Sequence, residues 1–146
     1  MIPVTQTTFY DPDAPPEKQR GNCLTAVVAS LMELPIEDVP NFVQDDVDHD
    51  GDADWGWWVR MNHFVRERGS TVEYLRVEGV EDPDFRPPEP GEFYAVIGVS
   101  PRNPKIHHIV IYQDGQMVHD PHPDRTGLVT VTDTYHWTIA RTGADQ

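Results

Sequence analysis

Cysteine is almost absent from this sequence, because Cys23 is the one thiol among 146 residues. A single cysteine cannot form an internal disulfide, so a disulfide-stapled scaffold is excluded and a reducing compartment is favoured. Long apolar runs are also lacking, since no stretch approaches the ~20 residues that a membrane helix needs. The first ten residues, "MIPVTQTTFY", have neither the basic start nor the long apolar core of a signal peptide. We therefore expect a cytoplasmic protein without membrane attachment.

Basic residues are scarce too. The chain has 11 Lys and Arg against 25 Asp and Glu, which gives a formal net charge of −14. This balance argues against nucleic-acid binding through a basic patch and against an anionic membrane surface as partner. Hydrophobic residues make up 38% of the chain and include four Trp, enough to build a core. With no internal repeat and no evident linker, we expect one domain over residues 1–146.

The N-terminal half has helical patterns. The stretch "CLTAVVASLMEL" predicts a helix from Cys23 that stops before Pro35, with Asn22 as its cap. A second helix is expected over "WGWWVRMNHFVRERG", with Gly69 as its stop. Residues 2–10 alternate loosely and predict a short strand.

After Gly69 the pattern changes to short segments rich in β-branched and aromatic residues, which are typical of strands. These segments are "TVEYLRV", "EFYAVIGVS", "HHIVIYQ", "QMVHD", "GLVTVTD" and "YHWTIAR". Asp114-Gly115 predicts a hairpin turn between two of them. The expected fold is α+β, with the Cys-bearing helix packed on an antiparallel sheet.

Cys23 has the position of a nucleophile. The thiolate is the reactive form of cysteine, and a helix N-terminus or a nearby imidazolium favours it over the thiol, whose ordinary pKa is ~8.5. Backbone N–H groups in the first turn lack intrahelical partners, so that of Cys23 is suited to hold an oxyanion. Gly21 is expected to leave room for a substrate backbone.

A nucleophilic cysteine needs a base, and seven histidines are available. His107 and His108 begin the predicted strand "HHIVIYQ", and Asp120 ends the next one. Because successive strand residues face opposite sides, only one of the two histidines can face Cys23. We favour His108, since it directly precedes the apolar run.

The segments "GNCLTAVVASLMELPIEDVPNF", "HHIVIY" and "VHDPHP", in this order, resemble the papain-like cysteine peptidase superfamily. The likeness is greatest to the type that processes bacteriocin leaders and to small phage and bacterial relatives. The resemblance implies a papain-like fold with Cys23 as nucleophile, His108 as base and Asp120 as the residue that orients the base. It also implies an upstream Gln in the oxyanion hole, for which Gln6 is preferred over Gln19.

The first hypothesis is therefore a thiol hydrolase that cleaves an amide or related acyl bond through a thioester and requires no cofactor. A peptide, an isopeptide or a small amide would be its substrate. The alternative is a non-catalytic acidic binding or inhibitor protein on the same scaffold.

The acidic stretch "DVDHDGDADWGW" matches the start of a calcium loop. Its candidate ligands are Asp46, Asp48, Asp50, Asp52 and Asp54. The twelfth position holds Trp57 instead of the usual bidentate Glu, so at most a weak Ca²⁺ site is expected, and a solvated loop without metal is favoured. One cysteine and no paired ligand spacing argue against structural zinc.

Overall fold

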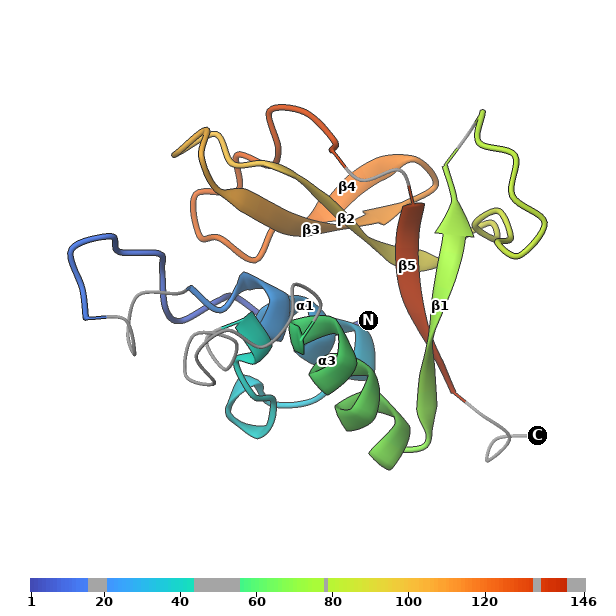
Figure 1. The fold of residues 1–146 in the computed structure, drawn as a ribbon, viewed down its shortest axis with the longest axis horizontal. Helices are drawn as coiled ribbons and strands as arrows, with labels where there is room; N and C mark the ends of the chain where they lie inside the picture. Colours follow the sequence, from blue (N-terminus) through green and yellow to red (C-terminus); the bar gives the residue numbers. More distant parts are fainter. Residues whose placement is uncertain (16–20, 44–55, 78, 133–134, 142–146) are drawn as a thin grey trace.

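The computed structural model describes residues 1–15, 21–43, 56–77, 79–132 and 135–141. Over these residues the fold is α+β, with the two helices α1 and α3 packed on a five-stranded antiparallel sheet of order β1-β5-β2-β3-β4 (Figure 1). The helical elements are α1 (Cys23–Met32), the short 3-10 helix η2 (Ile36–Asp38) and α3 (Gly56–Glu67). The strands are β1 (Ser70–Arg76), β2 (Phe93–Val99), β3 (His107–Gln113), β4 (Gln116–His119) and β5 (Tyr135–Arg141).

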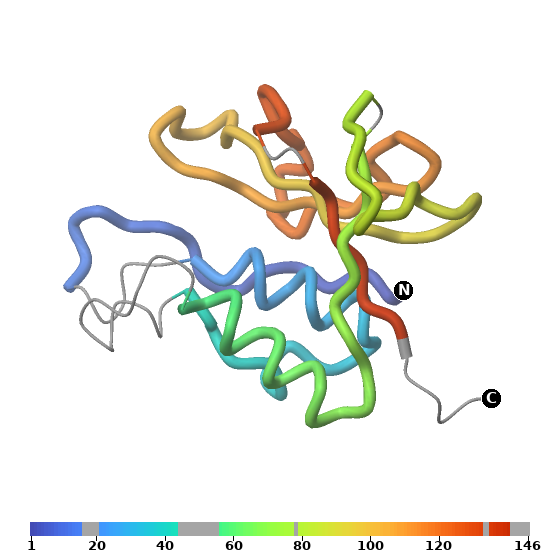
Figure 2. Tube along the Cα trace, turned by 45° about the vertical axis from the view of Figure 1, so that its right-hand side comes forward, coloured from blue at the N-terminus to red at the C-terminus, as the bar shows by residue number. Residues whose placement is uncertain are grey.

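Both α-helices lie on the same side of the sheet (Figures 1 and 2). Helix α1 packs mainly against β3, and α3 packs against β1. The core between these layers contains Val27 and Val28 of α1, Met61 of α3, and Ile111 and Trp137 of the sheet. No helix within the described residues has the length and apolar character required to cross a membrane.

Helix α1 is almost entirely interior, because every residue from Leu24 to Ser30 is buried. Its small residues allow close approach of neighbouring segments, and the hydroxyl of Ser30 donates to the Ala26 carbonyl within the helix. The helix ends at Glu33, which adopts a left-handed conformation with φ of 59°. The helix therefore ends slightly earlier than the predicted end just before Pro35.

The expected hairpin joins β3 and β4, and Asp114 and Gly115 both have positive φ, 52° and 79°. A turn of this kind suits the twist of two antiparallel strands. It sets Ile111 of β3 opposite His119 of β4. The residues that follow β4 are thereby placed near the start of β3.

Two strand predictions were wrong. Residues 2–10 form no strand. The Ile2 N–H donates instead to the carbonyl of Ser30 in α1, and the Gln6 N–H donates to the carbonyl of Pro121 in a loop. Residues 127–132 form an isolated bridge from Val131 to Gly98 rather than a strand. A side chain at Gly98 would lie only 2.1 Å from the Thr130 carbonyl oxygen, so this crossing depends on glycine.

Because His136 of β5 is held in an environment that disfavours its protonation, we expect the protein to lose stability in acid. Its ring stacks on Tyr94, with 5.3 Å between centroids, and its Nε2 is buried with no hydrogen-bond partner among the residues that the structure describes. Burial lowers the pKa of His136, so the unfolded chain, with a histidine pKa near ~6.5, binds the proton more readily. Stability should fall as pH drops through about 6.5. His136→Phe should weaken this dependence in thermal unfolding between pH 5 and 8; an unchanged slope would contradict it.

Candidate active site

Cys23 is the first residue of α1 and is half-buried. The capping prediction for Asn22 was wrong in one respect, because its side chain makes no hydrogen bond to the helix. Its Oδ1 instead accepts from the backbone N–H groups of Thr7 and Thr8, both at 2.9 Å. Asn22 therefore ties the N-terminal segment to the start of the Cys-bearing helix.

Glycine is needed at position 21 for a different reason from the one expected. A Cβ at this position would lie 3.0–3.1 Å from backbone atoms of Thr8, Phe9 and Tyr10. The space next to Gly21 is thus occupied by the protein's own N-terminal segment. The "GN" pair before the cysteine serves to bring residues 7–10 alongside the helix start.

His108 and Asp120 are hydrogen-bonded, with 2.6 Å between His108 Nε2 and Asp120 Oδ1. His108 begins β3 and is 4% exposed, while Asp120 directly follows β4 and is 1% exposed. The β3–β4 hairpin brings the two together although they are twelve positions apart. His107, one residue earlier, is exposed.

Asp120 is held by further bonds. Its Oδ1 accepts from the His122 backbone N–H at 2.9 Å, and its Oδ2 accepts from the Gly127 backbone N–H at 2.8 Å. Arg125 donates to the Asp120 carbonyl oxygen and also to Thr5 Oγ1. The carboxylate is therefore fixed in position and oriented towards His108.

The second partner of His108 is the Cys23 thiol. Burial alone lowers the pKa of His108, but its hydrogen bonds with Asp120 and Cys23 outweigh this effect and raise the pKa to about 9. Burial alone raises the pKa of Asp120, but hydrogen bonds from His108, His122 and Gly127 hold it below its usual value. Because Asp120 occupies Nε2, the nitrogen left for the thiol is Nδ1. The structure thus brings Cys23, His108 and Asp120 into one connected group.

Gln6 lies beside this group. Its side chain is 6% exposed and lines the same cleft as Cys23 and His108. The amide nitrogen donates to the Thr8 carbonyl at 3.0 Å, and Oε1 is buried with no hydrogen-bond partner in the described parts of the chain. An amide nitrogen carries two hydrogens, so one remains for another acceptor. Gln19, the other candidate, lies outside the described residues.

An open cleft of about 1280 Å³ runs past Cys23 and His108. One end is aromatic, with Trp57, Trp58, Tyr74, Tyr135 and Trp137 among its lining residues. The other end is lined by polar residues of 100–107 and by His122. Sequence reasoning assigned no role to Lys105 or Tyr74, because nothing in the local pattern shows that segments so far apart meet at one cleft.

The proposed calcium ligands Asp46, Asp48, Asp50, Asp52 and Asp54 all lie outside the described residues. Within the described parts of the chain, no three His, Cys, Asp or Glu side chains gather in a way that could hold a metal ion. The calcium hypothesis therefore stays a prediction from the sequence.

No protein-family model, curated protein or solved structure matches this chain.

Proposed function

We propose that this protein is a thiol hydrolase that cleaves an amide or related acyl bond, with Cys23 as nucleophile, His108 as base and Asp120 as the residue that orients the base. The observation that carries the proposal is the position of His108 between a helix-borne thiol and a buried carboxylate. A nucleophile, a base and a third group that orients the base are the parts of such a catalytic set. The helix-borne Cys, strand-borne His and following Asp support a papain-like arrangement.

The reaction follows from these positions. The Cys23 sulfur, having given its proton to His108, attacks the carbonyl carbon and forms the S–C bond of a tetrahedral intermediate. The C–N bond then breaks, and the leaving amine takes the proton from His108. Water, deprotonated by His108, hydrolyses the thioester and restores the thiol. Peptides, isopeptides and small amides all meet this chemistry.

The oxyanion of the intermediate requires donors. The Cys23 backbone N–H has no intrahelical acceptor, because it belongs to the first turn of α1. The second hydrogen of the Gln6 amide would complete the pair. Hydrogen bonds from Asn22 to Thr7 and Thr8 keep this part of the N-terminal segment near the helix start.

An activated ester tests the proposal without knowledge of the natural substrate. After brief mixing with p-nitrophenyl acetate near neutral pH, mass spectrometry should find one acetyl group on Cys23, followed by its loss. Cys23 should also react with iodoacetamide faster than free cysteine does. A thiol that reacts no faster than free cysteine and forms no acetyl enzyme would reject the proposal and favour the non-catalytic binding protein.

Gln6→Ala should reduce turnover of the ester by roughly 10²-fold, because the lost donor stabilises only the charge that develops in the transition state. Alkylation of Cys23 by iodoacetamide should change little, since that reaction forms no oxyanion. Gln113→Ala is a matched control, because Gln113 bonds to Gly91 away from the cleft. If Gln19→Ala gives the larger loss, the assignment of Gln6 is wrong.

A further inference from the structure

The polar end of the cleft differs in charge from the rest of the molecule. The chain has 25 Asp and Glu, yet none of them is among the described residues that line the cleft. The basic and imidazole side chains there are Arg102, Lys105, His107 and His122, in addition to His108. Because no described carboxylate lines the cleft, the lining residues that the structure describes do not repel a negatively charged ligand.

Lys105 supplies a positive charge at this end. It forms no ion pair with any residue that the structure describes, whereas Arg102 is paired with Asp124 at 2.9 Å. The loop that carries Lys105 is ordered by its own bonds, since Asn103 Oδ1 accepts from Lys105 N–H at 3.0 Å and Ile106 N–H bonds back to Asn103. An ammonium on an ordered loop, without a carboxylate partner among the described residues, is suited to bind an anion.

His122 adds a hydrogen-bond donor. His122 Nδ1 lies 3.1 Å from the Asp124 backbone N–H, which donates to it, and 3.1 Å from Asp124 Oδ1. In the neutral tautomer in which Nδ1 accepts from that N–H, the ring proton is on Nε2. Burial, together with the charge of Arg102, lowers the pKa of His122 and keeps the ring neutral near neutral pH. The ring lies against Phe9 and 6.4 Å from that of His108, measured between centroids. Nε2 has no partner among the described residues, so it can donate to a ligand in the cleft.

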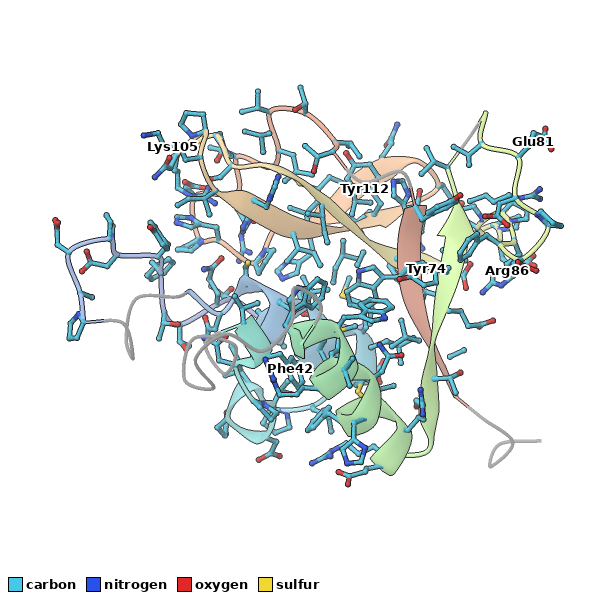
Figure 3. The ribbon with its side chains drawn as sticks, in the orientation of Figure 1. Phe42, Tyr74, Glu81, Arg86, Lys105 and Tyr112 are labelled. Atoms are coloured by element: carbon cyan, nitrogen blue, oxygen red, sulfur yellow. The ribbon has the colours of Figure 1, made fainter. Side chains whose placement is uncertain are left out.

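The opposite end of the cleft is aromatic instead of polar. Trp58 stacks on Tyr74 with 5.1 Å between ring centroids, and Trp137 meets Trp58 edge-on. Figure 3 shows Lys105 at the upper left and Tyr74 on β1, right of centre, well apart from each other. Among the described residues that line the cleft, the Lys and Arg side chains are Arg102 and Lys105, both at the polar end, so a ligand's negative group would set its direction in the cleft.

We propose that the end of the cleft formed by Lys105 and His122 binds a carboxylate of the substrate. The substrate is then an amide that has an acidic side chain or a free carboxyl end on one side of the bond to be cleaved. This inference rests on the proposed function, because it takes Cys23 as the reacting centre.

Matched pairs of alkylating probes test the inference without a known substrate. Chloroacetyl-glycine, chloroacetyl-diglycine and chloroacetyl-triglycine carry a carboxylate at increasing distance from the reactive carbon, and their amides are neutral controls of similar size. In each reaction the Cys23 sulfur forms a bond to the CH₂ carbon and chloride leaves. Each rate is divided by that of free cysteine, so that intrinsic reactivity cancels.

At low ionic strength we expect at least one acid to react roughly three- to tenfold faster than its amide. Lys105→Gln should reduce this ratio towards one, and about 0.5 M salt should do the same. Arg66→Gln is the matched control, because it removes one positive charge from an exposed position near the end of α3. His122→Gln should reduce the ratio less than Lys105→Gln does.

The inference is overturned if no acid is preferred, or if Lys105→Gln and Arg66→Gln lower the ratio equally. Failure of the proposed function gives a different result. In that case the neutral probes react with Cys23 no faster than with free cysteine, and His108→Ala leaves their rates unchanged. A charge preference that depends on Lys105 would still support the anion site, since the ratio is measured with any accessible thiol.

Discussion

Cys23→Ala should abolish ester turnover, lowering it by roughly 10⁴-fold or more to the level of the uncatalysed reaction. The chain holds no other thiol that could replace Cys23. His108→Ala should cost nearly as much, because it removes both the proton acceptor and the hydrogen-bond partner of the thiol. Alkylation of Cys23 by iodoacetamide near neutral pH should also slow in His108→Ala. Turnover and alkylation rates between pH 5 and 10 measure both effects.

The double variant distinguishes a catalytic unit from two separate residues. Because Cys23 and His108 act together, combining the two substitutions should add almost nothing to the loss from Cys23→Ala alone. His63→Ala is a suitable control, since His63 is exposed on α3 and pairs with Glu67. His107→Ala should lose far less than His108→Ala. Equal losses for the two neighbouring histidines, or an unchanged alkylation profile in His108→Ala, would contradict the assignment.

The proximity of His108 and Asp120 could be predicted from the sequence, because local patterns determine the hairpin that carries them. Alternation along "HHIVIYQ" allows only one of His107 and His108 to face the helix layer, and the apolar run favours His108. The hairpin signal at Asp114-Gly115 then returns the chain, so that Asp120 falls beside the start of the same strand. Each of these steps depends on residues within a single β-hairpin.

The remaining features depend on segments that are distant in sequence. Asparagine commonly caps helices, but the side chain of Asn22 accepts hydrogen bonds from the backbone of Thr7 and Thr8 instead. The stretch 127–132 has the residues of a strand and bonds through its backbone to Ile97 and Val99 of β2, yet it forms only an isolated bridge, at Gly98, instead of a strand. The lack of described carboxylates along the cleft likewise emerges only when several segments come together.

Asp120→Ala should be the most destabilising of the site substitutions. Asp120 is 1% exposed and accepts hydrogen bonds from His108, His122 and Gly127, all of which would lose their acceptor. Removing one partner of a buried ion pair typically costs about 3–5 kcal/mol. For a chain of this size that corresponds to a fall in Tm of about 10 °C or more. Asp124→Ala is a control, because Asp124 is a more exposed carboxylate of the same loop.

Asp120→Asn should separate stability from activity. The amide keeps the shape of the carboxylate and can still accept from one backbone N–H, so its cost in stability should be smaller than that of alanine. It cannot provide the charge that holds the proton on His108, so the ring should lose its raised pKa. Alkylation of Cys23 near neutral pH should therefore slow even where the variant remains folded.

The pH dependence of stability gives a further test of the same pair. His108 has a folded pKa of about 9, above its unfolded value of ~6.5, so its contribution is complete below about pH 6.5 and is lost as pH rises through 9. Asp120 has a folded pKa below its unfolded value of ~3.9, so its contribution is present above about pH 4 and is lost in stronger acid. The difference in unfolding free energy between wild type and Asp120→Asn should therefore be greatest between about pH 4 and 6.5 and should shrink on both sides. A difference that stays constant from pH 3 to 10 would mean that His108 and Asp120 do not form a charged pair.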